Sequence, residues 1–223
     1  VRIGLQHSRQ EDPRIDFQNM RPLAPDAGER LLALLDRMAE RCDAIAVADQ
    51  LRYGVVGEDA RKRLAYWAGQ GKRIVADSRD RIGSFRGVVV KPNEIEAARW
   101  LFPEAPYTNR AKEEWADIAV RLSREAGGPC CLTLSSSGAV WCENGESVFV
   151  PTRAVPPPLD IVGAGDAFAS ALLCALGAGS AGPEAAAFAH LASAVVIRKI
   201  GTTGTASPDE VRAVYASHAA SGE

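Results

Sequence analysis

A short run of small residues stands directly before an aspartate at the start of a predicted helix. Gly163, Ala164 and Gly165 precede Asp166, and an apolar, alanine-rich stretch follows over residues 167–177. The first amides of a helix have no intrahelical partner and lie at the positive end of the helix dipole. Because the two glycines have no side chain, an anion can approach the backbone closely there. The run therefore predicts a site for a phosphoryl group.

Asp166 adds a proton acceptor to this predicted anion site. A carboxylate beside such a site can take the proton of an attacking hydroxyl while a phosphoryl group moves onto that hydroxyl. Three prolines, residues 156–158, restrict the direction from which the chain arrives. A purely structural alternative is open at this point, in which Asp166 caps the helix and the glycines only make the turn.

The order of the predicted elements indicates an α/β protein. Helical patterns alternate with short apolar segments, typical of strands, over residues 43–49, 72–78, 87–93 and 129–135. Asn144-Gly145 is a signal for a two-residue hairpin turn, and long helices follow from about residues 164 and 183. We expect a single domain over residues 1–223. It is predicted to be a three-layer α/β/α sandwich with a mostly parallel central sheet and an antiparallel edge.

Polar residues gather at the predicted carboxyl ends of the strands, where open α/β sheets bind their ligands. Asp49 and Asp77 each close a short apolar run, and residues 91–93 and 133–137 end two further strands. Acids and small polar groups in this place suit phosphate and magnesium chemistry better than an apolar pocket does.

Composition and charge exclude several classes of protein. The formal net charge is −2, without the basic patch that nucleic acids require. The longest apolar helical run, residues 167–179, falls short of the ~20 residues that a membrane span needs. The five cysteines and three histidines show no zinc-ligand spacing, so we expect buried, reduced thiols. We therefore expect a cytoplasmic protein that binds neither nucleic acid nor membrane.

Several motifs, in this order, resemble the ribokinase-like (PfkB) carbohydrate kinases. DIVGAGDAFASALL, residues 160–173, resembles the Asp-Thr-x-Gly-Ala-Gly-Asp run of that family, with Ile161 in place of the usual threonine. Upstream, KPNEIEAA carries the family's Asn-x-x-Glu pattern as Asn93 and Glu96. LTLSSSGAVW and ASAVVIRKIGTTGTASPDEV resemble its nucleotide-side segments. Within the family, stretches such as RKIGTTGTAS look most like the heptose-phosphate kinase branch.

The resemblance implies roles for the two main motifs. Asp166 would be the general base that takes the proton of a sugar hydroxyl, and Gly163 to Gly165 would form the anion hole for the γ-phosphate of ATP. Asn93 and Glu96 would hold hydrated Mg²⁺ and the phosphates, since they lie one helical turn apart and can face one metal. The same spacing also fits a capping box, in which the two residues only begin a helix.

The resemblance also implies a nucleotide loop lined by Thr133, Ser135 and Gly138. The alternative for this loop is a plain strand–turn–strand connection. His190 stands where we expect an asparagine near the adenine, and its alternative is a packing role on an alanine-rich helix.

Three buried-strand or loop acids complete the candidate set. Asp49 and Asp77 either contact sugar hydroxyls or cap the turns that follow them. Asp160 is the candidate for placing a monovalent cation, as in some relatives.

The largest departure from the family lies at the front of the chain. The family's first strand and its early glycine-rich sugar-binding segment have no counterpart here, so we expect the N-terminal part of the fold to be missing. VRIGLQHSRQEDPRIDF, residues 1–17, resembles material that normally follows those segments near the lid over the sugar.

The leading hypothesis is an ATP-dependent kinase that phosphorylates a hydroxyl of a sugar or sugar phosphate, with Mg²⁺ as cofactor and a homodimer left open. The alternative is a catalytically silent kinase-like protein that binds nucleotide or sugar. A dinucleotide-dependent oxidoreductase is disfavoured, because VGAGD lacks the Gly-x-Gly-x-x-Gly spacing and does not open the first strand–helix unit.

Overall fold

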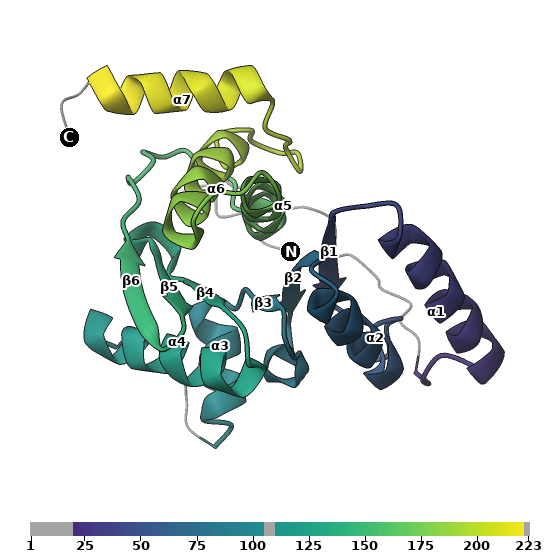
Figure 1. Ribbon diagram of the computed structural model, residues 1–223. Helices are drawn as coiled ribbons and strands as arrows, with labels where there is room; N and C mark the ends of the chain where they lie inside the picture. The colour runs from purple at the N-terminus through teal and green to yellow at the C-terminus, as the bar shows by residue number, and fades with distance from the viewer. Residues whose placement is uncertain (1–19, 105–109, 221–223) are drawn as a thin grey trace.

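A computed structural model describes residues 20–104 and 110–220 as alternating helices and strands (Figure 1). The helices are α1 (Pro25–Ala39), α2 (Glu58–Gly69), α3 (Glu94–Leu101), α4 (Lys112–Ala126), α5 (Ala164–Gly177), α6 (Gly182–Val196) and α7 (Pro208–Ala220). The strands are β1 (Ala44–Asp49), β2 (Arg73–Ser78), β3 (Val89–Val90), β4 (Cys130–Thr133), β5 (Ala139–Glu143) and β6 (Glu146–Val150). Two 3₁₀ turns, η1 (Ile82–Ser84) and η2 (Ser135–Ser137), complete these elements.

The strands form one sheet in chain order, from β1 at one edge to β6 at the other. β1 to β4 are parallel, whereas β4, β5 and β6 pair antiparallel. Asn144 and Gly145 connect β5 to β6 with φ angles of 53° and 83°. Both central residues of a type I′ hairpin turn require a positive φ, which asparagine and glycine tolerate best. The predicted mostly parallel sheet with an antiparallel edge is therefore confirmed.

Alternate residues of each strand face opposite layers of helices, as the two-residue period of a strand requires. One face of the sheet packs against α2, α3 and α4 through Val47, Ile74, Ala76, Val90 and Leu132. The other face packs against α5 and α6 through Val75, Cys131, Ala139 and Trp141. Figure 1 shows the two layers on either side of the sheet, with α1 outside α2. The three-layer α/β/α sandwich is thus confirmed.

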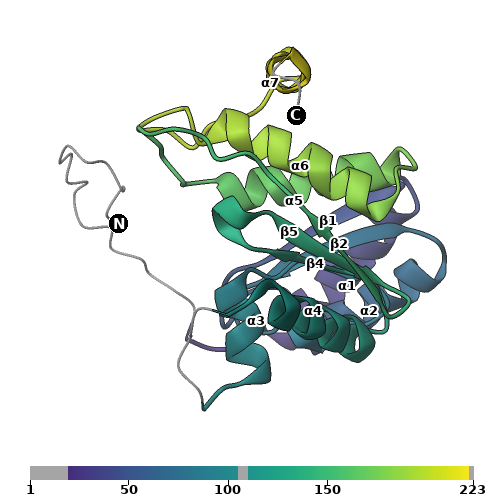
Figure 2. The same cartoon turned by 90° about the vertical axis from the view of Figure 1, so that its left-hand side faces the viewer.

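Helix α6 lies close to the sheet and to α5 because the residues on its inner face are small. Ala185, Ala186 and Ala189 are fully buried there. Gly182, the first residue of α6, lies against the indole ring of Trp141 on β5. Helix α7 covers α6 on the side away from the sheet, and Figure 2 shows it end-on there.

Two details differ from the sequence-based expectation or fall outside it. Strand β3 has two residues and is shorter than the expected segment of residues 87–93; Pro92, which has no amide proton, interrupts that segment before an isolated bridge between Asn93 and Thr133. Residues 1–17, which resemble lid-side material, lie outside the described residues. Within residues 20–104 and 110–220, no helix combines the length and apolar character that a membrane crossing would need.

The contact between Gly182 and Trp141 makes a testable prediction for Gly182→Ala. A Cβ atom at residue 182 would lie 1.9 Å from the Trp141 ring, and that ring is 4% exposed. Because a packed core does not absorb such an overlap, the free energy of unfolding should fall by about 1–3 kcal/mol. Gly69→Ala is the matched control, because nothing lies within 4 Å of a Cβ atom there. Urea unfolding should show a stability for Gly69→Ala that is unchanged or higher by up to ~1 kcal/mol; equal stabilities for both variants would contradict the packing argument.

Candidate functional site

The candidate site is built on the first turn of α5. Gly163, the N-cap residue, has φ 83° and ψ −2°, in the left-handed region that glycine adopts without strain. A Cβ atom at residue 163 would also lie 2.8 Å from the Thr203 methyl group. The amide of Ala164 donates to the carbonyl of Ile161 at 3.2 Å, which closes the turn. Asp166 follows in the first helical turn with an exposed side chain.

The amides around Asp166 are free to bind an anion. In the described part of the chain, the N–H groups of Gly163, Gly165 and Asp166 have no hydrogen-bond acceptor. The Asp166 carboxylate likewise has no hydrogen-bond or ion-pair partner among residues 20–104 and 110–220. Free donors at a helix start beside a free carboxylate are the two groups that transfer of a phosphoryl group to a hydroxyl requires.

Asp160 lies beneath this turn and is 2% exposed. One of its carboxylate oxygens accepts the Val162 amide and the other accepts the Gly201 amide, each at 3.0 Å. Both oxygens that the sequence offered to a monovalent cation therefore already accept protein hydrogen bonds.

A second group of charged residues lies at the carboxyl ends of β2 and β3. Lys91 Nζ is 3.1 Å from Asp77 Oδ2, and both side chains are largely buried. Asp77 follows Val75 by two residues, so it faces the same side of the sheet as α5. Lys91 and Arg79 both lie close enough to Glu96 to act on its charge. The predicted positions of Asp77 and Glu96 are thus brought together.

Asn93 and Glu96 form a capping box at the start of α3. Asn93 Oδ1 accepts the Glu96 amide at 2.8 Å, and Glu96 Oε2 accepts the Asn93 amide at 2.9 Å. Each side chain keeps its other polar atom for a further partner. Burial raises the pKa of Glu96, while the Asn93 amide and the Lys91 ammonium act in the opposite direction.

This donor set fits magnesium only if water and phosphate supply most of the ligands. Among the residues that the structure describes, no three His, Cys, Asp or Glu side chains come together to hold a metal ion. Mg²⁺ commonly keeps several waters and binds through one or two carboxylates plus substrate phosphates. Glu96 and Asn93 meet that requirement.

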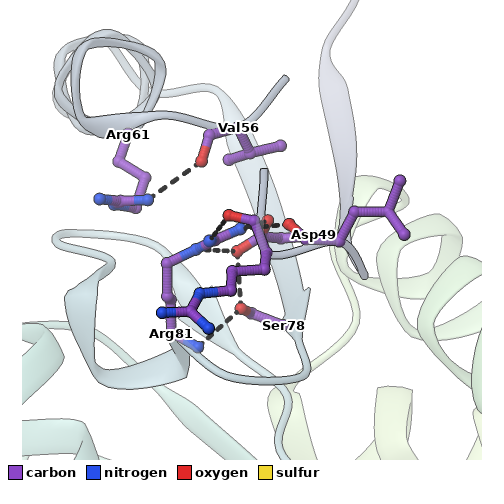
Figure 3. A network of polar contacts seen from close by, with 7 residues as sticks. Asp49, Val56, Arg61, Ser78 and Arg81 are labelled. Carbon is purple, nitrogen blue, oxygen red and sulfur yellow. Dashed lines mark hydrogen bonds and ion pairs between the residues drawn. The ribbon is translucent and has the colours of Figure 1, made fainter. Parts of the chain in front are cut away.

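Asp49 is held on the opposite face of the sheet from Asp77. Asp49 Oδ2 accepts Ser78 Oγ at 2.7 Å and Arg81 Nε at 3.0 Å, and Arg81 Nη2 contacts the other oxygen (Figure 3). The Arg81 guanidinium also donates to the carbonyls of Leu51 and Arg52 at 2.8 and 2.6 Å. Asp49 is 3% exposed, so its carboxylate fastens the loop after β1 in this structure. Its contact with a sugar stays a prediction.

The candidate nucleotide loop lies between β4 and β5. Thr133 donates its amide to the Pro92 carbonyl at 2.9 Å, which joins this loop to the segment of Asn93. Ser135 has φ 52° and donates its hydroxyl to Glu94 at 2.9 Å. Gly138 has φ 111°, and a Cβ atom there would lie 2.3 Å from the Val150 carbonyl oxygen. The hairpin alone therefore requires glycine at 138, whether or not a nucleotide binds.

His190 lies on α6 against Phe168 of α5, with ring centroids 5.0 Å apart in an edge-on arrangement. Its Nε2 atom is buried and has no hydrogen-bond partner in the described residues. Burial lowers the pKa of His190 to about 4, so its ring is neutral at pH 7. A neutral ring with one unused nitrogen can serve either packing or recognition of a base.

Two hollows on the described surface lie away from Asp166 and the first turn of α5. The larger, about 630 Å³, lies at the amino ends of α1 and α2 beside Arg52 and Arg61. The other, about 580 Å³, lies beside the β5–β6 turn. Asp166 lines neither of them, and its side chain is exposed.

Two charged residues of this region have partners that their place in the sequence does not predict. Lys91 interrupts the apolar run GVVVKPN, and a lysine so placed must either reach solvent or find an acid. Arg81 lies in a polar loop, where nothing in the sequence pairs it with Asp49.

Comparison with known proteins identifies the family and the fold. The sequence model described as pfkB family carbohydrate kinase matches residues 88–210. The bifunctional protein HldE of Syntrophotalea carbinolica is 30% identical over 220 residues, which cover 95% of this chain and 43% of that relative. The chain thus spans less than half the length of the curated relatives it matches.

Solved structures share the fold at low sequence identity. Phosphofructokinase-2 from Escherichia coli, solved with substrates and products, has a TM-score of 0.67 at 20% identity, covering 88% of this chain and 63% of that chain. The same enzyme with potassium gives 0.67 at 20% identity, over 89% and 64% of the two chains. Arabidopsis thaliana ribokinase, complexed with ribose and ATP, gives 0.64 at 18% identity, over 86% and 59%.

The buried His190 ring leads to a prediction about pH dependence. The unfolded chain gains a proton on this ring near pH 6.5, whereas the folded chain does so only near 4. The unfolded state therefore binds more protons between these values, and the free energy of unfolding should fall as the pH is lowered from 6.5 to 4, by up to about 3 kcal/mol. Urea unfolding at several pH values should show this slope, and His190→Asn should reduce it. An NMR titration that places the His190 pKa near 6.5 would contradict the assignment.

Proposed function

Because this chain belongs to the pfkB family of carbohydrate kinases, we propose that it transfers the γ-phosphoryl group of ATP to a hydroxyl of a sugar or sugar phosphate. The observation that carries the proposal is the free Asp166 carboxylate beside the free amides of Gly163 and Gly165. Neither group has another task among the described residues, and together they match the two ends of a phosphoryl transfer.

In the proposed reaction the sugar hydroxyl attacks the γ-phosphorus in line with the departing ADP oxygen. Asp166 accepts the hydroxyl proton as the new oxygen–phosphorus bond forms and the bond to ADP breaks. The amides of Gly163, Gly165 and Asp166 donate to the phosphoryl oxygens, whose charge is greatest in the transition state. Ala164 keeps the turn closed through its bond to Ile161.

Asn93 and Glu96 are proposed to hold Mg²⁺ through water, on the atoms that the capping box leaves unused. When bound, this ion would neutralise part of the charge of the ATP phosphates. The buried Lys91–Asp77 pair next to Glu96 keeps the surrounding charge balanced before the phosphates arrive. Asp160 stays the candidate for a monovalent cation, and phosphofructokinase-2 solved with potassium supports that proposal.

The remaining candidates form the proposed nucleotide and acceptor sites. Thr133, Ser135 and Gly138 would border the nucleotide, with His190 near its base. Of the two acids proposed for the sugar, Asp77 has the better position, because it faces the side of the sheet that carries α5. Asp49 would have to release Arg81 to reach a ligand.

The proposed phosphoryl acceptor is supported by the similarity to relatives and not by the geometry of the site. The similarity to proteins named HldE supports the heptose-phosphate kinase branch, and with it a sugar phosphate as acceptor. A single kinase domain over residues 1–223 and a homodimer stay predictions. The chain covers 43% of the HldE protein of Syntrophotalea carbinolica, so the activity of the whole protein is part of the proposal.

Asp166→Asn tests the proposed base directly. Asparagine keeps the shape of the side chain but cannot take up the proton, so kcat should fall by about 10²–10⁴. A coupled assay of ADP release in the full-length protein, with ATP, Mg²⁺ and a panel of sugars and sugar phosphates, measures this. Asp26→Asn is the matched control, since Asp26 lies in the first turn of α1 and should leave kcat unchanged.

Two results of that assay would overturn the proposal. Equal kcat for Asp166→Asn and wild type would remove Asp166 from the mechanism. Absence of phosphate transfer by the wild type, together with retained nucleotide or sugar binding, would establish the silent kinase-like alternative.

Glu96→Gln separates the proposed magnesium role of Glu96 from its structural role. Glutamine can still accept the Asn93 amide, so the capping box and the helix start should remain. Loss of the charge should raise the Mg²⁺ concentration for half-maximal activity by roughly 10–100-fold. Glu113→Gln, the same change in the first turn of α4, should leave it unchanged. A Mg²⁺ dependence of Glu96→Gln equal to that of the wild type would leave Glu96 with the capping role alone.

A further inference from the structure

Asp160 is a buried acid for which the proposed reaction has no use as a proton acceptor. Its own amide donates to the Ile197 carbonyl at 2.9 Å, and its two oxygens accept the amides of Val162 and Gly201. The bonds to Ile197 and Gly201 tie the segment that leads into α5 to the end of α6 and the segment that follows it, and Gly201 lies 41 residues further along the chain. The bond to Val162 is local and fixes the turn itself.

Backbone amides are the partners that compensate the charge of Asp160. Within residues 20–104 and 110–220, no lysine, arginine or histidine forms an ion pair with it. Burying a carboxylate to 2% exposure is unfavourable for folding unless both of its oxygens accept hydrogen bonds, so the fold requires both of these bonds. The buried carboxylate thus fixes the backbone at two points, Val162 and Gly201.

The bond to Val162 determines which amides of the turn face outward. The Val162 N–H points inward to Asp160, whereas the next N–H groups, of Gly163, Gly165 and Asp166, remain free among the described residues. The bond to Gly201 fixes the other segment, which carries Thr203 against Gly163. Ser193 of α6 adds a third tie, donating its hydroxyl to the Ala164 carbonyl at 3.1 Å.

We infer that Asp160 is a positioning residue for phosphoryl transfer, which holds the amides of residues 163–166 in the orientation that meets the transferring phosphate. This inference rests on the proposed function for its kinetic consequence. Its structural part, that the Asp160 carboxylate bonds the turn to Gly201, rests on the hydrogen bonds themselves.

Asp160→Asn is the variant that tests the inference. A carboxylate accepts hydrogen bonds on both sides, whereas an amide accepts on one side and donates on the other. In either orientation, asparagine faces one backbone N–H with its own NH₂ group. One of the two hydrogen bonds, from Val162 or from Gly201, must therefore break while the side-chain volume is kept. Ser123→Ala is the control, because it removes another hydrogen bond of a buried side chain, from Ser123 on α4 to the Gly128 carbonyl, on the opposite face of the sheet from α5.

The first measurement is hydrogen exchange, which does not depend on activity. In Asp160→Asn, the amide of Val162 or Gly201 should exchange at least about tenfold faster than in the wild type, while amides of the core strands keep their protection. Ser123→Ala should leave both amides unchanged. Unchanged exchange at both amides in Asp160→Asn would overturn the structural part of the inference.

The second measurement is the split between kcat and the KM for ATP in the full-length protein. Misplaced amides should lower kcat by about 10–100-fold. Removal of a negative charge near the phosphates does not weaken their attraction, so KM for ATP should stay within about threefold of wild type. Ser123→Ala should keep the wild-type kcat.

The possible outcomes separate the inference from the proposed function. A wild type without kinase activity removes the proposed function, while the exchange data still decide the lock. An active wild type with unchanged kcat in Asp160→Asn, despite faster exchange, overturns the positioning role. A rise in KM for ATP without loss of kcat does the same.

Discussion

The proposed site depends on one constraint, which is that several backbone amides must stay without a protein partner in a folded chain. Such groups are costly when buried, so the fold leaves them exposed at the first turn of α5. The left-handed conformation of Gly163 turns the chain sharply into the helix, and the packed α5–α6 pair keeps that turn in place. The remaining elements of the sheet bring Asn93, Glu96 and Asp77 to the edge where the strands end.

Much of the fold could be predicted from the sequence, because local signals and long-range packing agree in this chain. Asn144-Gly145 specifies the hairpin, and the alternation of helices with short apolar strands specifies a mostly parallel sheet. The turn before α5 was predictable for the same reason, since Gly163 and Gly165 at a helix start act within a few residues. The length of β3 departed from the expectation, and so did Cys174, whose thiol is exposed rather than buried.

The relation between Asp49 and Asp77 was not predictable, because it depends on the register of two strands. Both acids end apolar runs, yet Asp49 pairs with Ser78, and Asp77 pairs with Ala48. This offset of one residue sends the two carboxylates to opposite faces of the sheet. The buried ion pair of Lys91 with Asp77 and the bond from Gly201 to Asp160 were not predictable for a similar reason. Each joins segments that are distant along the chain.

The two glycines of the turn differ in what excludes a side chain from them. At Gly163 the backbone angle and the Thr203 methyl group both rule out a Cβ atom, so the protein's own architecture demands glycine. At Gly165 nothing lies within 4 Å of a Cβ atom, and folding places no such demand. Homologous sequences should therefore keep glycine at position 163, because any other residue there would destabilise the fold. If homologous sequences also keep glycine at position 165, where folding does not require it, the reason would be a bound ligand that occupies the space of a side chain.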